Sequence, residues 1–134
     1  MEFAKMIILD THIWIWWINN DLQSLGVVRQ GQIMSAEVIA ESAISCFEVA
    51  WLARHRRITL PCQTVEWVEK ALSPSGISLL PITPAIATRA VDLQEHHSDP
   101  QDRIIIASAI EHNAQLMSND SKFHLYLEME ERLL

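Results

Sequence analysis

The sequence contains little cysteine, which excludes two common ways of stabilising a small fold. Only Cys46 and Cys62 occur among its 134 residues. They form no CxxC pair and belong to no Cys/His set with the spacing of a zinc site. A chain of this length is expected to form one domain, residues 1–134, and to bury about two thirds of the surface of its unfolded chain without a disulfide or structural metal. We expect both thiols to be reduced, as in intracellular proteins.

Positive charge and long apolar runs are also scarce. Ten Lys and Arg residues against 17 Asp and Glu residues give a formal net charge of −7, which argues against a broad basic surface that holds nucleic acid. The apolar runs at 6–9 and 13–18 are interrupted by polar residues, so we expect neither a signal peptide nor a membrane span. The sequence has no P-loop, no GxGxxG and no Ser or Cys nucleophile motif.

Four short apolar runs have the length of buried strands. They span residues 5–9, 38–44, 77–82 and 115–118. Apolar runs without alternation are typical of a parallel sheet that is buried on both faces. The helical patterns between them predict helices over 12–18, from Ser45 to 54–57, over 63–72 and 84–95, from Pro100 onward and over 121–127. We therefore predict an α/β fold in which helices cover both faces of a parallel sheet.

Residues 22–37 fit this pattern least well. They indicate a weaker helical region that is interrupted by Gly26 and Gly31. The preceding helix, residues 12–18, is apolar on nearly every side, so it must pack on more than one face.

The segment 98–103, Ser-Asp-Pro-Gln-Asp-Arg, predicts the start of the most informative helix. Asp99 suits the N-cap, and Pro100 suits the first helical position because it has no N–H to offer. Asp102 lies on the same helical face as Ile106, at the top of a stripe that must be buried. An acid at the edge of a core needs a cation, a donor or a metal. Capping and the helix dipole also account for both acids, so both interpretations stay open.

Three further acids stand at the ends of apolar segments. Asp10 and Asp120 each follow a predicted strand, and Glu48 comes three residues after Ser45. In open α/β sheets, ligands bind at the carboxyl ends of the strands. Each acid also has a structural alternative: Asp10 and Asp120 can cap the helices that follow them, and Glu48 can be the capping-box partner of Ser45.

Together these acids predict a cation site. The candidate residues are Asp10, Glu48, Asp99, Asp102 and Asp120. The carboxyl ends of the strands in a parallel sheet lie at one rim. Carboxylates that meet there repel one another unless they bind a hard cation. Mg²⁺ and Mn²⁺ prefer such oxygen ligands. An ion of this kind activates water and stabilises charge on phosphate, which points to metal-dependent phosphodiester hydrolysis.

The basic and histidine residues offer weaker signals. A predicted helix ends in Arg-His-Arg-Arg at residues 54–57, where the helix dipole favours positive charge. Such residues usually form a solvated helix end. In a nuclease, the alternative is that they contact phosphates. His12 beside Asp10 is a possible ligand, although packing is the commoner role of such a residue. The pair at 96–97 favours an exposed loop.

Four motifs in order resemble a known family. They are Leu9-Asp10-Thr11-His12 with Trp16-Trp17, Ser45-x-x-Glu48, His97-x-Asp99-Pro100-x-Asp102-Arg103, and Ser118-x-Asp120-x-x-Phe123. The chain resembles the PIN-domain ribonucleases, specifically VapC-like toxins of type II toxin–antitoxin systems. Each motif is weak alone, but the resemblance spans nearly the whole chain.

The resemblance implies a PIN-like three-layer α/β/α sandwich with a central four- to five-stranded parallel sheet. It implies a Mg²⁺- or Mn²⁺-dependent endoribonuclease in which Asp10, Glu48 and Asp102 are the core metal-binding and catalytic acids. Asp120 matches a last, more variable acid of that set. Asp99 matches one branch of the family, as a ligand, a supporting residue or a cap. Arg103 is implied either to orient carboxylates or to dock the rim of the sheet.

The resemblance also implies partners: an RNA substrate in the cytoplasm, a homodimer, and an antitoxin whose C-terminal segment covers the site. No membrane contact is expected. Two features depart from the family pattern. Ser118 stands where many relatives have threonine, and residues 26–37 do not match well.

Two other functions compete with this hypothesis. One is a PIN-like module that binds protein or RNA and uses its acids only as helix caps. The other is a phosphatase or phosphotransferase with an aspartyl nucleophile after the first strand. Families of that kind usually carry a second acid two residues later, where this chain has His12.

Overall fold

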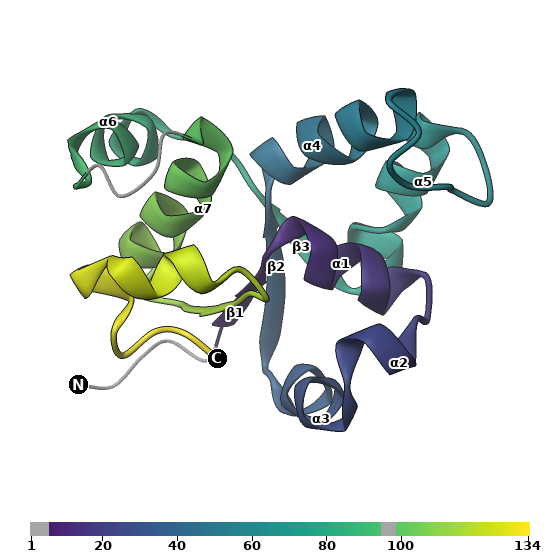
Figure 1. Ribbon diagram of the computed structural model, residues 1–134, viewed down its shortest axis with the longest axis horizontal. Helices are drawn as coiled ribbons and strands as arrows, with labels where there is room; N and C mark the ends of the chain where they lie inside the picture. Colours follow the sequence, from purple (N-terminus) through teal and green to yellow (C-terminus); the bar gives the residue numbers. More distant parts are fainter. Residues whose placement is uncertain (1–5, 95–98) are drawn as a thin grey trace.

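The computed structural model describes residues 6–94 and 99–134, and its centre is a parallel sheet (Figure 1). The strands of this sheet are β1 Met6–Leu9, β2 Val38–Ser42, β3 Ile77–Leu80 and β4 Gln115–Met117. Their order is β3-β2-β1-β4. In the register of the sheet, Ile7 of β1 lies opposite Ile39 on one side and Gln115 on the other. The predicted parallel sheet is confirmed, with four strands among the described residues.

The sheet is buried on both faces because successive side chains of a strand point in opposite directions. In β1, Ile7 and Leu9 pack into one hydrophobic cluster, whereas Ile8 packs into another. Ile8 and Leu9 are fully buried. This double burial explains why the strand sequences are continuously apolar rather than alternating.

Helices form the two outer layers (Figure 1). The cluster around Ile7 and Leu9 takes side chains from α1 Thr11–Ile18, α2 Leu22–Leu25, α3 Val27–Ser35, α4 Ala43–Arg54 and α5 Thr64–Lys70. The cluster around Ile8 takes them from α7 Pro100–Glu111 and from the 3₁₀ helices η2 Ser121–Leu125 and η3 Leu127–Met129. The remaining helices are α6 Pro84–Asp92, which packs on α7, and the 3₁₀ helix η1 Ser73–Ser75. The three-layer arrangement is confirmed. Within the described ranges, no helix combines the length and apolarity needed to cross a membrane.

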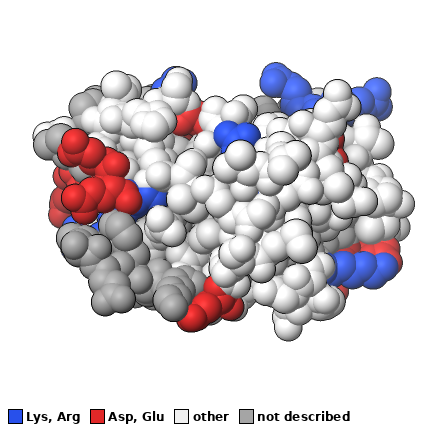
Figure 2. Space-filling view, turned by 90° about the horizontal axis from the view of Figure 1, so that it is seen from below, with Lys and Arg blue, Asp and Glu red and all other residues white. Residues whose placement is uncertain are grey.

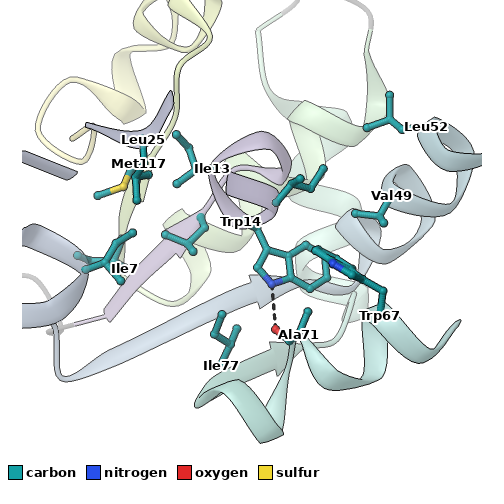
Figure 3. Packing of buried hydrophobic residues seen from close by; sticks show 13 residues of the cluster. Ile7, Ile13, Trp14, Leu25, Val49, Leu52, Trp67, Ala71, Ile77 and Met117 are labelled. Atoms are coloured by element: carbon teal, nitrogen blue, oxygen red, sulfur yellow. Dashed lines mark hydrogen bonds between the residues drawn. The ribbon is translucent and has the colours of Figure 1, made fainter. Parts of the chain in front are cut away.

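Two tryptophans fix α1 against α5 (Figure 3). Trp14 and Trp67 meet edge to face, with ring centroids 5.2 Å apart. Each indole N–H is also satisfied, because Trp14 Nε1 donates to the carbonyl of Ala71 at 2.9 Å and Trp67 Nε1 donates to Asn19 Oδ1 at 2.8 Å. Buried indoles are stable only with such partners. These contacts hold α1 against α5, and the N-terminal end of α1 lies at the rim of the sheet because it follows β1 directly.

Helix α4 begins earlier than predicted. Its N-cap is Ser42, whose hydroxyl accepts a hydrogen bond from the Ile44 N–H at 3.3 Å, and not Ser45. The polar pair Glu41-Ser42 completes β2, so the strand ends at Ser42 instead of continuing to residue 44. The prediction of Ser45 as the cap was wrong because the polar end of the strand was not recognised.

Two other boundaries also differ from the prediction. Gly26 does separate α2 from α3, with φ of +89°, but Gly31 lies inside α3 and interrupts nothing. The segment predicted as a helix over 121–127 consists of 3₁₀ turns. Helix α6 ends at Asp92 rather than at residue 95.

Candidate functional site

A cavity of about 480 Å³ opens at the carboxyl end of the sheet. It lies beyond the ends of β1 and β4 and beside the first turn of α7. Its lining residues are Asp10, His12, Trp16, Glu48, Asp99, Asp102, Asn119, Asp120 and Ser121. The structure thus brings all five predicted acids to one cavity, although they are separated by up to 110 residues in sequence. This is the outcome expected when strand ends share one rim.

Asp10 is held by hydrogen bonds to both of its carboxylate oxygens. The backbone N–H of Thr11 donates to Oδ1 at 2.7 Å, and the hydroxyl of Ser118 donates to Oδ2 at 2.8 Å. The backbone N–H of Asp10 donates to the carbonyl of Met117 at 2.9 Å, which fixes the end of β1 against β4. Burial raises the pKa of Asp10, and these two bonds to the carboxylate oppose the rise.

Glu48 is oriented by a residue on another helix. Thr11 Oγ1 donates to Glu48 Oε1 at 2.8 Å and lies 3.0 Å from Ser45 Oγ. The capping-box alternative is wrong, because α4 begins at Ala43 and Glu48 lies beyond the first turn, where it cannot reach the N-cap N–H. Burial raises the pKa of Glu48, and the nearby carboxylates of Asp10 and Asp99 raise it further.

Asp99 and Asp120 cap helices while also lining the cavity. Asp99 Oδ1 accepts from the Gln101 N–H, and Asp120 Oδ1 accepts from the Lys122 N–H, both at 2.9 Å. The predicted caps are therefore confirmed for these two acids, and Asp10 caps α1 in the same way. Each cap bond uses one carboxylate oxygen, so a capping role and a place at the cavity are compatible.

Asp102 carries the strongest electrostatic signal of the cavity. It occupies the third position of α7, where the helix dipole favours a charged carboxylate. Its pKa is nevertheless raised to about 8, first by burial and then by repulsion from Asp99, Asp10, Asp120 and Glu48. The cavity thus concentrates negative charge beyond what a helix start compensates.

The donor set of the cavity suits a hard cation. Its acidic groups present only carboxylate oxygens, the ligands that Mg²⁺ and Mn²⁺ prefer. Within residues 6–94 and 99–134, no three Asp, Glu, His or Cys side chains form a group that could already hold a metal ion. The carboxylates therefore line a common space without converging on one point, as expected for like charges.

Glu41 was missed by the sequence analysis. It lies in β2, its side chain is fully buried, and neither of its carboxyl oxygens has a hydrogen-bond partner. Burial raises its pKa well above the usual range, a rise that the nearby hydroxyl of Ser45 opposes and that Asp10 and Glu48 reinforce. The available signal is a glutamate directly after the apolar residues 38–40, at the end of a strand.

Arg103 takes a role that differs from both of its implied ones. Its buried guanidinium donates to four backbone carbonyls at or just beyond the C-terminal end of α6, those of Ala90, Val91, Leu93 and Gln94, at 2.6 to 3.1 Å. The planar guanidinium holds its N–H donors in a rigid fork, which suits a fixed set of acceptors of this kind. Arg103 therefore docks α6 against α7: its described hydrogen bonds reach neither a carboxylate nor the rim of the sheet, so both implied roles are wrong.

Of the histidines singled out in the sequence, His12 lies at the cavity. His12 is exposed and lines the cavity beside Trp16, with ring centroids 6.4 Å apart. The predicted packing role of His12 is therefore wrong, because α1 turns this side chain outward. The pair at 96–97 lies outside the described residues.

Comparisons with known proteins agree with this arrangement. A family model described as PIN domain matches residues 7–126. Ribonuclease VapC22 of Mycobacterium tuberculosis (strain ATCC 25618 / H37Rv) is 36% identical over 117 residues, which are 87% of this chain and 88% of that protein. The matched region includes all five acids of the cavity.

Solved structures share the fold at low sequence identity. VapBC2 from Rickettsia felis, bound to a DNA fragment from their promoter, has a TM-score of 0.70 at 18% identity and covers 96% of this chain and 97% of its own. DNA-bound VapBC from Salmonella typhimurium has a TM-score of 0.71 at 18% identity and covers 96% of both chains. At this identity, the likeness establishes the architecture alone.

Proposed function

Because the chain belongs to the PIN-domain family and is VapC-like over most of its length, we propose that it is a metal-dependent endoribonuclease. A single observation carries the proposal. Five carboxylates from four separate parts of the chain line one cavity, and burial, together with repulsion from the other four, raises the pKa of Asp102 to about 8. Uncompensated charge of this kind marks a site that is completed by a positive ligand.

The acids that would hold the ion are Asp10, Glu48, Asp99, Asp102 and Asp120. When bound, Mg²⁺ or Mn²⁺ would activate water for attack on a phosphodiester and stabilise the charge that develops on the phosphate. Asp10 is buried and Glu48, Asp102 and Asp120 are half-buried, whereas Asp99 is exposed. Asp10, Glu48 and Asp102 would form the core of the site, together with Asp120 as the last catalytic acid. Asp99 would support Asp102, because it lies in the same helix start.

The chain's own residues would orient this site. The Ser118 hydroxyl and the Thr11 N–H hold Asp10, and the Thr11 hydroxyl holds Glu48. These bonds fix the direction of both carboxylates before any ion enters. Hydrogen bonds of this kind to ligand side chains typically contribute about 10–100-fold in metal affinity or activity.

We also propose that this chain is the toxin of a type II toxin–antitoxin pair. The relatives that support it are a ribonuclease VapC and structures described as VapBC complexes. Helix α3 also exposes apolar side chains: Val27, Val28 and Met34 are 83%, 74% and 77% exposed. Exposed apolar side chains of this kind are typical of a surface that a partner covers. We propose two such assemblies, a homodimer and a complex with an antitoxin.

The competing function, an interaction module whose acids are only caps, explains three acids but not all five. Asp10, Asp99 and Asp120 are caps. Glu48 caps nothing, and Asp102 sits at a helix start with a raised pKa. A purely structural use of these residues would not place Glu48 on the same cavity.

The test is cleavage of total cellular RNA by the purified protein with Mg²⁺, with Mn²⁺ and with EDTA. We expect discrete fragments that require metal and that disappear in the variants Asp10→Asn and Asp102→Asn. Asp21→Asn is the matched control, because Asp21 caps α2 on the surface and does not line the cavity. This control should cleave as the unmodified protein does.

Mn²⁺ binding separates the two functions. An inactive protein that still binds Mn²⁺, and loses that binding in both cavity variants, would retain the metal site and direct the search to another RNA. A protein that neither cleaves RNA nor binds Mn²⁺ would contradict the proposal and favour the interaction module.

A further inference from the structure

Helix α4 carries an exposed strip of aromatic and basic side chains, which we call the α4 strip. Phe47, Trp51, Arg54 and His55 follow one another at helical spacing, so they lie on one face. Arg56 and Arg57 continue the strip just beyond the end of the helix. None of these residues lines the cavity of the five acids.

The aromatic part of the strip is unusual for this molecule. Phe47 is 59% exposed and Trp51 is 42% exposed. The other described Phe, Trp and Tyr side chains are buried or half-buried. The Trp51 ring is also held in place, because the His55 ring stacks on it with centroids 4.0 Å apart and the Arg57 guanidinium lies 5.9 Å from its centroid. An ordered, exposed ring is a ready surface for a flat ligand.

The basic part of the strip concentrates the positive charge of an acidic protein. Three of the ten Lys and Arg residues fall within positions 54–57. Elsewhere, Lys70 pairs with Glu66, Arg89 pairs with Glu111, and Arg103 binds carbonyls. In the described part of the chain, Arg54, Arg56 and Arg57 have no carboxylate partner. Figure 2 shows the opposite side of the molecule, as seen from below in Figure 1, where most of the surface is uncharged and charged side chains gather in a few places near its edges.

The strip is continuous with the candidate active site. Glu48 lines the cavity, and Trp51 follows it three residues later, so the two side chains are neighbours on the surface of α4. From Glu48 to Arg54 the helix advances about 9 Å, at a rise of about 1.5 Å per residue. In Figure 1, α4 starts where β2 ends and runs outward from the rim of the sheet. A chain bound at the cavity can therefore continue along the strip.

We propose that the α4 strip binds single-stranded RNA adjacent to the cleaved bond, with bases stacked on Phe47 and Trp51 and phosphates bound by Arg54, Arg56 and Arg57. The inference rests on the proposed function and names the side on which the substrate extends. Exposed aromatic rings beside a basic track form the standard surface for single strands, because every base has a face that stacks. Unpaired arginines match phosphate oxygens in charge and shape. An antitoxin segment would use the apolar rings but would leave three arginines without a required partner.

The experiment measures binding of a labelled single-stranded RNA oligonucleotide in EDTA, so that cleavage plays no part. The variants are Trp51→Ala, Trp51→Phe and the triple variant Arg54→Gln, Arg56→Gln, Arg57→Gln. We expect Trp51→Ala to weaken binding about tenfold and Trp51→Phe to restore most of it. The triple variant should bind more weakly and reduce the slope of log affinity against log salt by about 2, since each phosphate contact on a single strand contributes about 0.7.

The control is the double variant Val65→Ala, Lys70→Gln, which removes one exposed apolar and one basic side chain from α5. It should bind RNA as the unmodified protein does, and circular dichroism should show all variants folded. RNA affinity that is unchanged in Trp51→Ala and in the triple variant, or absent from the unmodified protein, would overturn the inference. So would variants that bind RNA normally and lose only their affinity for an antitoxin.

The two proposals fail separately. If the unmodified protein cleaves RNA with metal and the strip variants bind and cleave normally, the strip is not a substrate site and the nuclease remains. If the unmodified protein does not cleave but binds RNA through the strip, the binding surface stands and the catalytic proposal fails.

Discussion

Thr11 joins the start of α1 to α4 by donating its hydroxyl to Glu48 Oε1 at 2.8 Å. The same residue donates its backbone N–H to Asp10 Oδ1. One buried threonine thus orients two of the three acids proposed to form the core of the metal site, which come from positions 38 residues apart in the sequence. This relationship gives the motif Asp10-Thr11 a physical meaning beyond a strand end followed by a helix.

Thr11→Val should therefore weaken the site without changing the fold. Valine has nearly the same shape but no hydroxyl, so Glu48 loses its donor while the backbone bond to Asp10 remains. We expect the affinity for Mn²⁺, measured by titration calorimetry, and the cleavage rate to fall about 10–100-fold. Thr11→Ser keeps the hydroxyl and should retain most of both. A Thr11→Val protein with unchanged Mn²⁺ affinity would show that this bond does not serve the site.

The raised pKa of Asp102 predicts how stability depends on pH in the absence of metal. The folded-state value of about 8 exceeds the ordinary value of 3.8. The contribution of Asp102 to stability is thus fully present below pH 3.8 and is lost progressively as the pH rises to and through about 8. In Asp102→Asn the side chain at position 102 is uncharged at every pH. The free energy of unfolding of this variant should therefore increase relative to that of the unmodified protein as the pH rises.

The size of this effect is limited by solvent. Asp102 is only partly buried, so we expect a relative gain of about 1 kcal/mol between pH 5 and pH 8 rather than the full value of the shift. Urea unfolding in EDTA at both pH values measures it. Asp21→Asn, an exposed cap, should show no such trend. Saturating Mg²⁺ should reverse the order, because the ion stabilises only a protein that retains its ligand.

Much of this site is predictable from sequence because strand ends and helix starts have local signals. Asp10 and Asp120 follow apolar runs, and Asp99 precedes Pro100, so each is recognisable as a residue at a boundary. Parallel topology then brings these boundaries to one rim. The prediction of a shared cavity needed only the order of elements, which the alternation of apolar runs and helical patterns provides.

The errors have a common cause in tertiary contacts that leave no local signal. Ser45 has the spacing of a capping box with Glu48, but the bond from Thr11 comes from another helix. Arg103 has the position of a site residue, but its partners are carbonyls at the end of α6. Glu41 resembles a polar interruption, and its complete burial depends on packing across β2. None of these partners can be inferred from neighbouring residues in the sequence.

Glu41 should reduce the stability of the protein. Its two carboxyl oxygens are buried without partners, and such groups cost about 1–3 kcal/mol each when their hydration is lost. Glu41→Met has a similar length and no oxygen, so we expect its free energy of unfolding to rise by about 1–3 kcal/mol at pH 7. The pKa of Glu41 is raised well above its ordinary value, so this gain should be small in acid and should grow as the pH rises.

Glu41→Gln separates charge from polarity. It stays neutral at all pH values but keeps a buried polar group, so its gain in stability over the unmodified protein should also grow as the pH rises, without reaching the gain of Glu41→Met. Glu69→Gln, an exposed substitution on α5, is the control. A Glu41→Met protein that folds but is less stable than the unmodified protein would contradict this prediction. It would mean that the buried carboxyl group stabilises the protein although it has no hydrogen-bond partner.

Gly26 and Gly31 lie five residues apart and should respond in opposite ways to alanine. Gly31 lies within α3, and a Cβ atom placed there meets no atom within 4 Å. Gly31→Ala should raise the free energy of unfolding by about 0.5–1 kcal/mol, because alanine loses less backbone entropy in a helix. Gly26 also has open space around it, but its φ of +89° and ψ of 156° fall in a region that only glycine adopts readily.

Gly26→Ala should therefore lower the free energy of unfolding by about 1–3 kcal/mol, although no side chain obstructs the new methyl group. Urea unfolding of both variants at one pH measures the difference, and their opposite signs control for any general effect of substitution in this region. The pair tests how residues 22–37 are built, since sequence alone predicts two interruptions. Equal destabilisation by both variants would mean that Gly31 also breaks the helix; opposite signs would establish that α3 is continuous and that Gly26 alone forms the junction with α2.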